Sequence, residues 1–295
     1  MTGNGRIPAP AGVRTTVPVL ASDGQRVAAH VLGGSGPPLL LAHATGFHGR
    51  VWGPLADRLA STFSCVAPDL RGHGDSPPPA GRQLSWSDFA RDLLAVVDGL
   101  GLRRPVGVGH SGGATGLLLA EQARPGTFAQ LYCFEPIVVP ADPPLGRDPD
   151  SWLAEQTRRR RAAFASRAAA LDHYAARPPL SQLDPAVLRA YVEHGLEDAG
   201  NGAVRLKCVP EYEALVYEMA TEHDCFVRMA SVRCPVILVR GARSDACPPG
   251  LFEKLAVRLR RCRSEVLPGL SHLGPLEDAD AVARSIRRAF APSGP

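Results

Sequence analysis

Ser111 lies in a G-x-S-x-G pattern, which favours a catalytic nucleophile over an incidental serine in a glycine-rich turn. The pattern spans Gly109–Gly113, follows the apolar run Val106–Val108 and opens the small, apolar helical pattern Gly112–Ala123. A strand that turns sharply into a helix holds the serine above the sheet edge in a strained conformation, and small flanking residues let strand and helix approach closely. The Gly112 N–H, at the start of the helix, lacks an intrahelical partner and is predicted to face a developing oxyanion.

A serine hydroxyl is a poor nucleophile without a base, and His272 is the best candidate among nine histidines. It follows the strand-like Val266-Leu267 and precedes the last predicted helix, which places it on a loop at the same sheet edge as Ser111. The base needs an orienting carboxylate. Asp245 comes just after a buried strand, and the order Ser111, Asp245, His272 suits this chemistry. Glu135, at the end of the preceding strand, is the alternative acid; we favour Asp245.

The elements that must position these residues alternate between strands and helices. Short apolar runs predict strands buried on both faces, as in a parallel sheet, and segments with helical spacing separate them. This alternation predicts a doubly wound, mostly parallel α/β sheet. The predicted strands are Val13–Leu20, Arg26–Leu32, Pro38–Ala42, Phe63–Ala67, Val106–Val108, Gln130–Phe134 and Pro235–Val239, and the helices are Trp52–Ala60, Ser85–Leu100, Gly112–Ala123, Leu251–Leu259 and Asp278–Phe290.

One stretch interrupts this alternation. Residues 137–233 contain helical patterns at Trp152–Ala170, Pro185–Leu196 and Pro210–Ala220, with no convincing strand. We therefore predict a helical cap over 137–233, inserted into a core formed by 1–136 and 234–295. The run Arg158–Arg161 lies on the first of these helices. A solvated helix face is our favoured interpretation of this run, and contact with an anionic substrate is the alternative.

Composition excludes several other classes. Apolar residues make up 45% of the chain and charged residues 21%, as in ordinary globular proteins. The formal net charge of +4 is spread along the chain, so we expect no nucleic-acid partner. No apolar run is long enough to span a bilayer, and the seven cysteines show no metal-binding spacing. We expect a soluble, cytoplasmic protein with no membrane partner, no metal and no cofactor; the oligomeric state cannot be predicted.

The chain resembles the α/β-hydrolase fold superfamily through five segments, which occur in order and span most of the core. They are HATGFHGRVW (His43–Trp52), PDLRGHGDS (Pro68–Ser76), GHSGG (Gly109–Gly113), RGARSD (Arg240–Asp245) and GLSHLGPLED (Gly269–Asp278). The cap also resembles actinobacterial members whose substrate is unassigned. The resemblance implies an eight-stranded sheet with the cap between strands 6 and 7.

The resemblance also implies a second oxyanion donor, the N–H of Thr45. Ala44 replaces the glycine of the family's H-G sequence here, so the turn is expected to differ. Phe47 and His48 lie near this loop and are candidates either to line the pocket or to pack beside it. In the same family, Asp69, Arg71 and Asp75 belong to a loop that is chiefly structural.

These residues predict a serine hydrolase that cleaves a carboxylic ester, lactone or thioester of a small acyl substrate. The alternative with the same triad is an acyltransferase or cyclase of natural-product biosynthesis. A ligand-binding protein without catalysis is a third hypothesis, which we disfavour because all three catalytic groups are present in order. Epoxide hydrolases and haloalkane dehalogenases of this fold use an aspartate nucleophile, so Ser111 argues against both.

Overall fold

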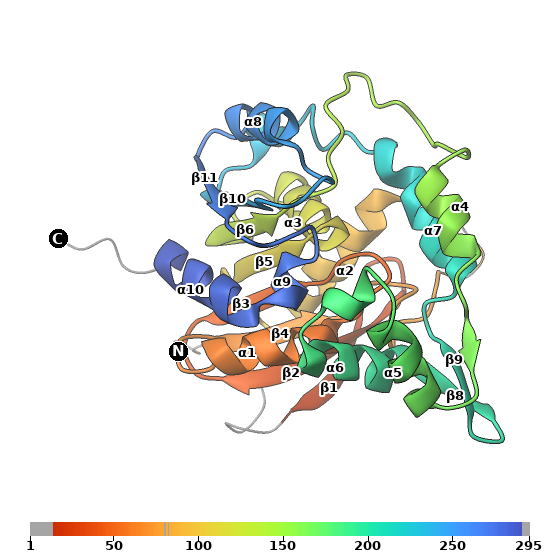
Figure 1. Ribbon diagram of the computed structural model, residues 1–295. Coiled ribbons are helices and arrows are strands. Elements are labelled where there is room, and N and C mark those ends of the chain that lie inside the picture. Colours follow the sequence, from red (N-terminus) through yellow and green to blue (C-terminus); the bar gives the residue numbers. More distant parts are fainter. Residues whose placement is uncertain (1–13, 80, 82, 291–295) are drawn as a thin grey trace.

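A twisted eight-stranded sheet forms the centre of the computed structural model, which describes residues 14–79, 81 and 83–290 (Figure 1). The strand order is β1-β2-β4-β3-β5-β6-β10-β11. Their bounds are β1 Thr15–Leu20, β2 Arg26–Gly34, β3 Pro38–Ala42, β4 Ser64–Pro68, β5 Val106–His110, β6 Gln130–Phe134, β10 Val236–Gly241 and β11 Cys262–Leu267. Within the described part of this sheet, only the pairs β1–β2 and β2–β4 are antiparallel. The predicted mostly parallel, eight-stranded sheet is confirmed. Residues 1–13 of the predicted core, with the start of its first strand, lie outside the described residues.

Helices cover both faces of this sheet, which explains the unbroken apolar runs. Leu39 and Leu41 of β3 pack with α1 (Gly53–Leu59) and α10 (Ala279–Phe290). Leu40, between them in the sequence, points to the other face and belongs to a buried cluster that includes residues of α2 (Trp86–Gly99), α3 (Gly112–Ala123) and α8 (Pro249–Arg258). Successive residues of a strand point to opposite faces, so a strand covered on both sides must be apolar throughout. The short helices η1 (Gly49–Trp52) and α9 (Gly274–Glu277) follow β3 and β11.

The N-terminus of α2 shows how local sequence fixes a helix start. The Ser85 side chain accepts from the backbone of the first turn, and Asp88 Oδ2 accepts from the Ser85 N–H at 2.9 Å. This reciprocal capping box fixes the start of α2 at Trp86, one residue after the start of the predicted helix.

A cap is inserted between β6 and β10, the sixth and seventh strands of the core, as predicted. It contains the helices α4 (Trp152–Arg158), α5 (Arg167–Ala175), α6 (Pro185–Gly195) and α7 (Pro210–Glu218), with the short helices η2 (Leu180–Gln182), η3 (Met219–Thr221) and η4 (Met229–Ser231). It also contains a three-stranded antiparallel sheet, ordered β7-β9-β8, from Ala163–Phe164, Ala203–Leu206 and Leu196–Gly200. The prediction of a cap without strands was therefore wrong.

The single helix predicted for Trp152–Ala170 was also wrong. It breaks after Arg158, and the chain then forms β7 before α5 begins at Arg167. The break coincides with Arg160, whose side chain turns inward to bond Tyr191 and Glu213. The buried polar contact and the pairing of β7 with β9 together override the helical spacing of the sequence.

The cap packs on the core above the carboxyl ends of the parallel strands. Phe47 and Val51, which follow β3, share a buried cluster with Tyr191 and Val192 of α6. In Figure 1, α4 and α7 lie together on the right of the molecule, and α5 and α6 lie below them. Among the described residues, no helix is both long and apolar enough to cross a membrane.

Candidate active site

Ser111 occupies the sharp turn between β5 and α3. Its backbone angles are φ 54° and ψ −120°, a strained combination for a residue with a side chain. A Cβ added to Gly113 would lie 2.4 Å from the carbonyl oxygens of Ala42 and His43, and one on Gly109 would lie 2.5 Å from Ala114 Cα. Backbone atoms cannot move aside as a flexible side chain can. The predicted elbow, with an obligatory small residue on each side, is therefore present.

His272 lies on the loop between β11 and α9, within hydrogen-bond reach of the serine. Its Nε2 is 3.1 Å from Ser111 Oγ, so the ring can accept the hydroxyl proton. The buried His110 holds this loop in place, because its Nε2 donates to the His272 carbonyl at 2.8 Å. Burial lowers the pKa of His110 well below its usual value, so this ring is a neutral donor. The structure thus brings Ser111 and His272 together as predicted, and His110 bonds the backbone of the loop that carries His272.

The carboxylate beside His272 belongs to Glu135. The prediction that Asp245 is the orienting acid was therefore wrong. Glu135 Oε2 accepts from His272 Nδ1 at 2.7 Å. The Gly241 N–H and the Ser244 hydroxyl donate to the same carboxylate at 2.8 and 2.6 Å. Asp245 has an exposed side chain. The acid offered as the alternative is therefore the one that can orient the base.

The backbone explains why these two acids differ. Glu135 comes directly after β6 with φ 46°, a left-handed conformation that turns its side chain into the protein beneath His272. The loop after β10 instead points Ser244 inward, and the next residue, Asp245, faces outward. The loop that was expected to carry the acid carries a hydrogen-bond donor to it.

The two predicted oxyanion donors are neighbours across the elbow. A Cβ on Gly112 would lie 2.8 Å from Thr45 Oγ1 and 3.7 Å from Thr45 N. Ala44 causes no strain, because the left-handed residue of this turn is Gly46, with φ 81°, and Ala44 is not among the residues with positive φ. The replacement of the family's glycine at position 44 is therefore compatible with a tight turn at Thr45. The oxyanion hole formed by the Thr45 and Gly112 N–H groups stays a prediction.

Phe47 and His48 pack against the cap. The Phe47 ring lies 5.3 Å from that of Tyr191, centre to centre, and His48 stacks on the same tyrosine at 6.0 Å. His48 Nε2 also bonds the Tyr191 carbonyl at 3.3 Å. Burial lowers the pKa of His48 to about 4, so the ring is neutral near pH 7. These contacts favour the packing interpretation of both residues.

The arginine run does not form one solvated face. Arg158 pairs with Glu218, and Arg159 pairs with Glu155. Arg161 lies over the Phe164 ring. Arg160 is different, because it is directed inward and its guanidinium bonds the Tyr191 hydroxyl at 2.6 Å and the Glu213 carboxylate. The preferred interpretation was wrong for Arg160, and its pairing with Glu213 leaves it no excess charge to attract an anion.

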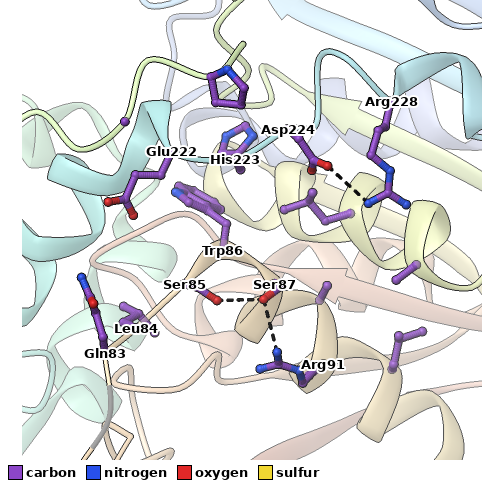
Figure 2. Close-up of a pocket in the computed structure, with 16 residues that line it drawn as sticks. Gln83, Leu84, Ser85, Trp86, Ser87, Arg91, Glu222, His223, Asp224 and Arg228 are labelled. Carbon is purple, nitrogen blue, oxygen red and sulfur yellow. Dashed lines mark hydrogen bonds and ion pairs between the residues drawn. The ribbon is translucent and has the colours of Figure 1, made fainter. Parts of the chain in front are cut away.

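A cavity of about 770 Å³ lies behind the elbow rather than at it. Figure 2 shows Trp86 and His223 side by side in its wall, with ring centres 5.0 Å apart. The far corner of the Trp86 ring would lie 3.5 Å from a Cβ on Gly112, so this indole separates the cavity from the candidate oxyanion site. The indole is fixed by a 2.7 Å hydrogen bond to the Met219 carbonyl. Solvent instead reaches the triad at His272, whose side chain is 25% exposed.

Within the described part of the chain, one group of side chains has a spacing that could hold a metal ion: His30, Asp69 and Asp75. Its atoms already have protein partners. Asp69 accepts from His30 at 2.9 Å and from the backbone N–H groups of Gly49 and Asp75 at 2.6 Å each, while Asp75 pairs with Lys207. These bonds, together with those from the buried Arg71 to Asp92, make the loop after β4 a structural network.

Three features of the site were missed by the sequence analysis: Ser244, the anchoring role of His110, and Glu213. Ser244 and His110 sit within recognised motifs, one residue from the positions that drew attention. Glu213 could be found only by knowing that the cap helix α7 rests on the loop after β3. No local pattern in the sequence reports that contact.

Comparison with known proteins identifies the family. Residues 39–285 match the sequence model of the Alpha/beta hydrolase family, which covers most of the chain. The chain belongs to this family. The structure of an E-2-(acetamidomethylene)succinate hydrolase superposes with a TM-score of 0.79 at 21% identity, covering 94% of this chain and 98% of that one. A peroxisomal α/β-hydrolase of Saccharomyces cerevisiae gives the same TM-score at 24% identity, covering 97% and 87% of the two chains. Likeness at these identities establishes the shared α/β-hydrolase fold.

Relatives found by sequence match shorter stretches. An uncharacterised protein of Mycobacterium tuberculosis is 38% identical over 94 residues, or 31% of this chain and 27% of the relative. A fluoroacetate dehalogenase of a Burkholderia species is 39% identical over 95 residues, or 30% of this chain and 31% of the relative. The matched stretches span less than a third of these relatives' own lengths. These partial matches identify related sequence but assign no bond to be cleaved by this α/β hydrolase.

Proposed function

We propose that this α/β hydrolase is a serine hydrolase that cleaves a carboxylic ester, lactone or thioester of a small acyl substrate. The observation that carries the proposal is the continuous chain of hydrogen bonds from Ser111 Oγ through His272 to Glu135, at 3.1 and 2.7 Å. A nucleophile, a base and an orienting carboxylate in this order are the arrangement that serine-based acyl transfer needs.

In the proposed mechanism, Ser111 Oγ attacks the substrate carbonyl carbon while its proton passes to His272 Nε2. Glu135 holds Nδ1 protonated, which keeps Nε2 free as the acceptor, and stabilises the imidazolium that forms. The N–H groups of Thr45 and Gly112 bind the tetrahedral oxyanion. His272 then gives its proton to the leaving alcohol or thiol. Water repeats the sequence on the acyl-enzyme and releases the acid with Ser111 restored.

Ser111 also separates this chemistry from that of relatives with other leaving groups. Displacement of halide, or opening of an epoxide, by a carboxylate gives an ester that water can hydrolyse. The same attack by a serine hydroxyl would give a stable ether, and the enzyme could not turn over. A serine at the elbow therefore supports attack on an acyl carbon rather than on an alkyl carbon.

The test is a screen of the purified protein against p-nitrophenyl esters, lactones and acyl thioesters, with Ser111→Ala as the control. We expect hydrolysis in at least one class and a loss of about 10³-fold or more in Ser111→Ala. A fluorophosphonate should label the wild-type protein at Ser111, as located by mass spectrometry. An unchanged rate in Ser111→Ala, with labelling elsewhere, would refute the proposal. Product analysis with added alcohol or amine acceptors would show whether the acyl group passes to water or to another acceptor.

A further inference from the structure

Glu213 of the cap lies against the turn that carries the proposed oxyanion donor. It is buried, with 5% of its surface exposed. A Cβ on Gly46 would lie 2.3 Å from Glu213 Oε1 and 2.8 Å from its carboxyl carbon. Gly46 follows Thr45 and has φ 81°. The carboxylate therefore occupies the space that any other residue at position 46 would need, one residue from the Thr45 N–H.

The same helix reaches the core at two further points. The Tyr212 ring fills the space beside Gly72, and its hydroxyl donates to the Arg71 carbonyl at 2.8 Å. At the other end of α7, the Met219 carbonyl accepts from Trp86, whose ring lies against Gly112. Helix α7 thus supports both sides of the proposed oxyanion hole, and Glu213 is the contact on the Thr45 side.

A carboxylate at this place would oppose catalysis if its charge were not balanced. The oxyanion is negative, and a second negative charge nearby in a water-poor site would raise the energy of the transition state. Arg160 supplies the balance, because its guanidinium pairs with Glu213 and bonds the Tyr191 hydroxyl at 2.6 Å. Tyr217 donates to Glu213 Oε1 at 3.4 Å.

We infer that Arg160 and Glu213 form a positioning pair for the oxyanion hole, an inference that rests on the proposed serine hydrolase function. Glu213 holds the Thr45–Gly46 turn in place from the cap side, and Arg160 cancels its charge so that the turn presents only donors to the oxyanion. Neither residue touches the substrate. Both act through the Thr45 N–H.

An experiment can control the charge of Glu213, because the other groups around it keep a fixed charge. Those that interact with it are Arg160, Tyr191, Tyr217 and Cys208. Burial raises the pKa values of both tyrosines and of the Cys208 thiol above their usual values, so all three stay neutral in a neutral-pH assay. Burial also raises the pKa of Glu213, and the Arg160 guanidinium opposes that rise. Loss of Arg160 should therefore raise the pKa of Glu213 further and bring its ionisation into the assay range.

The experiment measures kcat and KM from pH 5.5 to 8.5 for wild type, Arg160→Met, Glu213→Gln and the double variant. In Arg160→Met, we expect kcat near the wild-type value at low pH, where Glu213 is protonated. It should fall by about tenfold to a hundredfold as Glu213 ionises, a fraction of the cost of losing one oxyanion donor. KM should change little. Glu213→Gln and the double variant should lack this alkaline fall.

The matched control is Arg158→Met, which breaks the neighbouring cap ion pair between Arg158, the last residue of α4, and Glu218, the last residue of α7. It should leave the shape of the pH profile unchanged. Arg160→Gln provides a second way to remove the charge if Arg160→Met does not fold. The inference is overturned if neither Arg160 variant gains the alkaline fall, or if the double variant, which has glutamine at position 213, still shows it. Failure of the proposed function would look different, since hydrolysis would then persist in Ser111→Ala whatever the Arg160 variants do.

Discussion

The ends of strands β6 and β10 carry one acid each, and only one of these acids meets the histidine. Glu135 follows β6, is buried and accepts three hydrogen bonds, from His272, Gly241 and Ser244. Asp245 lies in the loop after β10 and faces outward. Both strands are parallel neighbours, so their carboxyl ends meet at the same sheet edge. The contrast teaches that the edge of a sheet limits the candidates for a catalytic acid, while the conformation of one residue selects between them.

The largest effect that can test this contrast is expected from Glu135→Gln. An amide in place of the carboxylate cannot stabilise the imidazolium, so kcat should fall by about 10³–10⁴-fold. The matched variant Asp245→Asn changes an exposed side chain and should stay within about twofold of wild type. Both rates are measured on the best ester of the substrate screen. The opposite ranking would show that the loop after β10 rearranges to deliver Asp245 during turnover.

A smaller effect is expected from Ser244→Ala. This change removes one donor from the Glu135 carboxylate, a hydrogen bond to a charged group worth about 1.5–3 kcal/mol. Only part of that energy concerns the imidazolium state, so we expect kcat to fall by about tenfold.

The control for Ser244→Ala is a double-mutant cycle with Glu135→Gln. If Ser244 acts through the Glu135 charge, its removal should matter much less in the Glu135→Gln background. Equal losses in the two backgrounds would instead mean that Ser244 supports the loop and not the acid.

The elbow and the base were predictable because their requirements are local. Gly109 and Gly113 are demanded by backbone contacts with the nearest strand and helix, and these contacts recur wherever a strand turns into a helix this sharply. His272 follows from the order of elements along the chain. The central strands were predictable for a similar reason, since burial on both faces leaves an unbroken apolar run.

The acid and the cap were less predictable because they depend on contacts between distant segments. The inward turn of Glu135 rests on φ 46° at a single residue, which no pattern in the neighbouring sequence reports. Strand β8 contains exposed polar residues and β7 has only two residues, so neither shows an alternating pattern. The helical spacing around Arg160 is overridden by its pairing with Glu213, 53 residues further along the chain.

The same contrast between a buried and an exposed titratable group extends to the histidines, with the smallest expected effect on activity. Burial lowers the pKa of His73 to about 4, against an ordinary value of 6.5. Below pH 6.5, His73 is protonated in the unfolded chain but stays neutral in the folded chain. The free energy of unfolding therefore falls as the pH falls from 6.5 towards 4. His43, with a pKa of about 3, and His223, at about 4, act in the same direction.

The change His73→Phe should reduce by one the number of protons that the chain takes up on unfolding in acid. It should reduce the slope of unfolding free energy against pH by about 1.4 kcal/mol per pH unit between pH 6 and 4.5. Urea unfolding at several pH values measures that slope, whatever the absolute stability of the variant. His173→Phe, at a partly exposed histidine of α5, is the control and should change the slope less. Because His73 bonds the Arg71 carbonyl and not a residue of the triad, kcat per folded molecule at pH 7.5 should stay near the wild-type value. A slope equal to that of wild type would mean that His73 is protonated in the folded protein, and that the loop after β4 opens to water in acid.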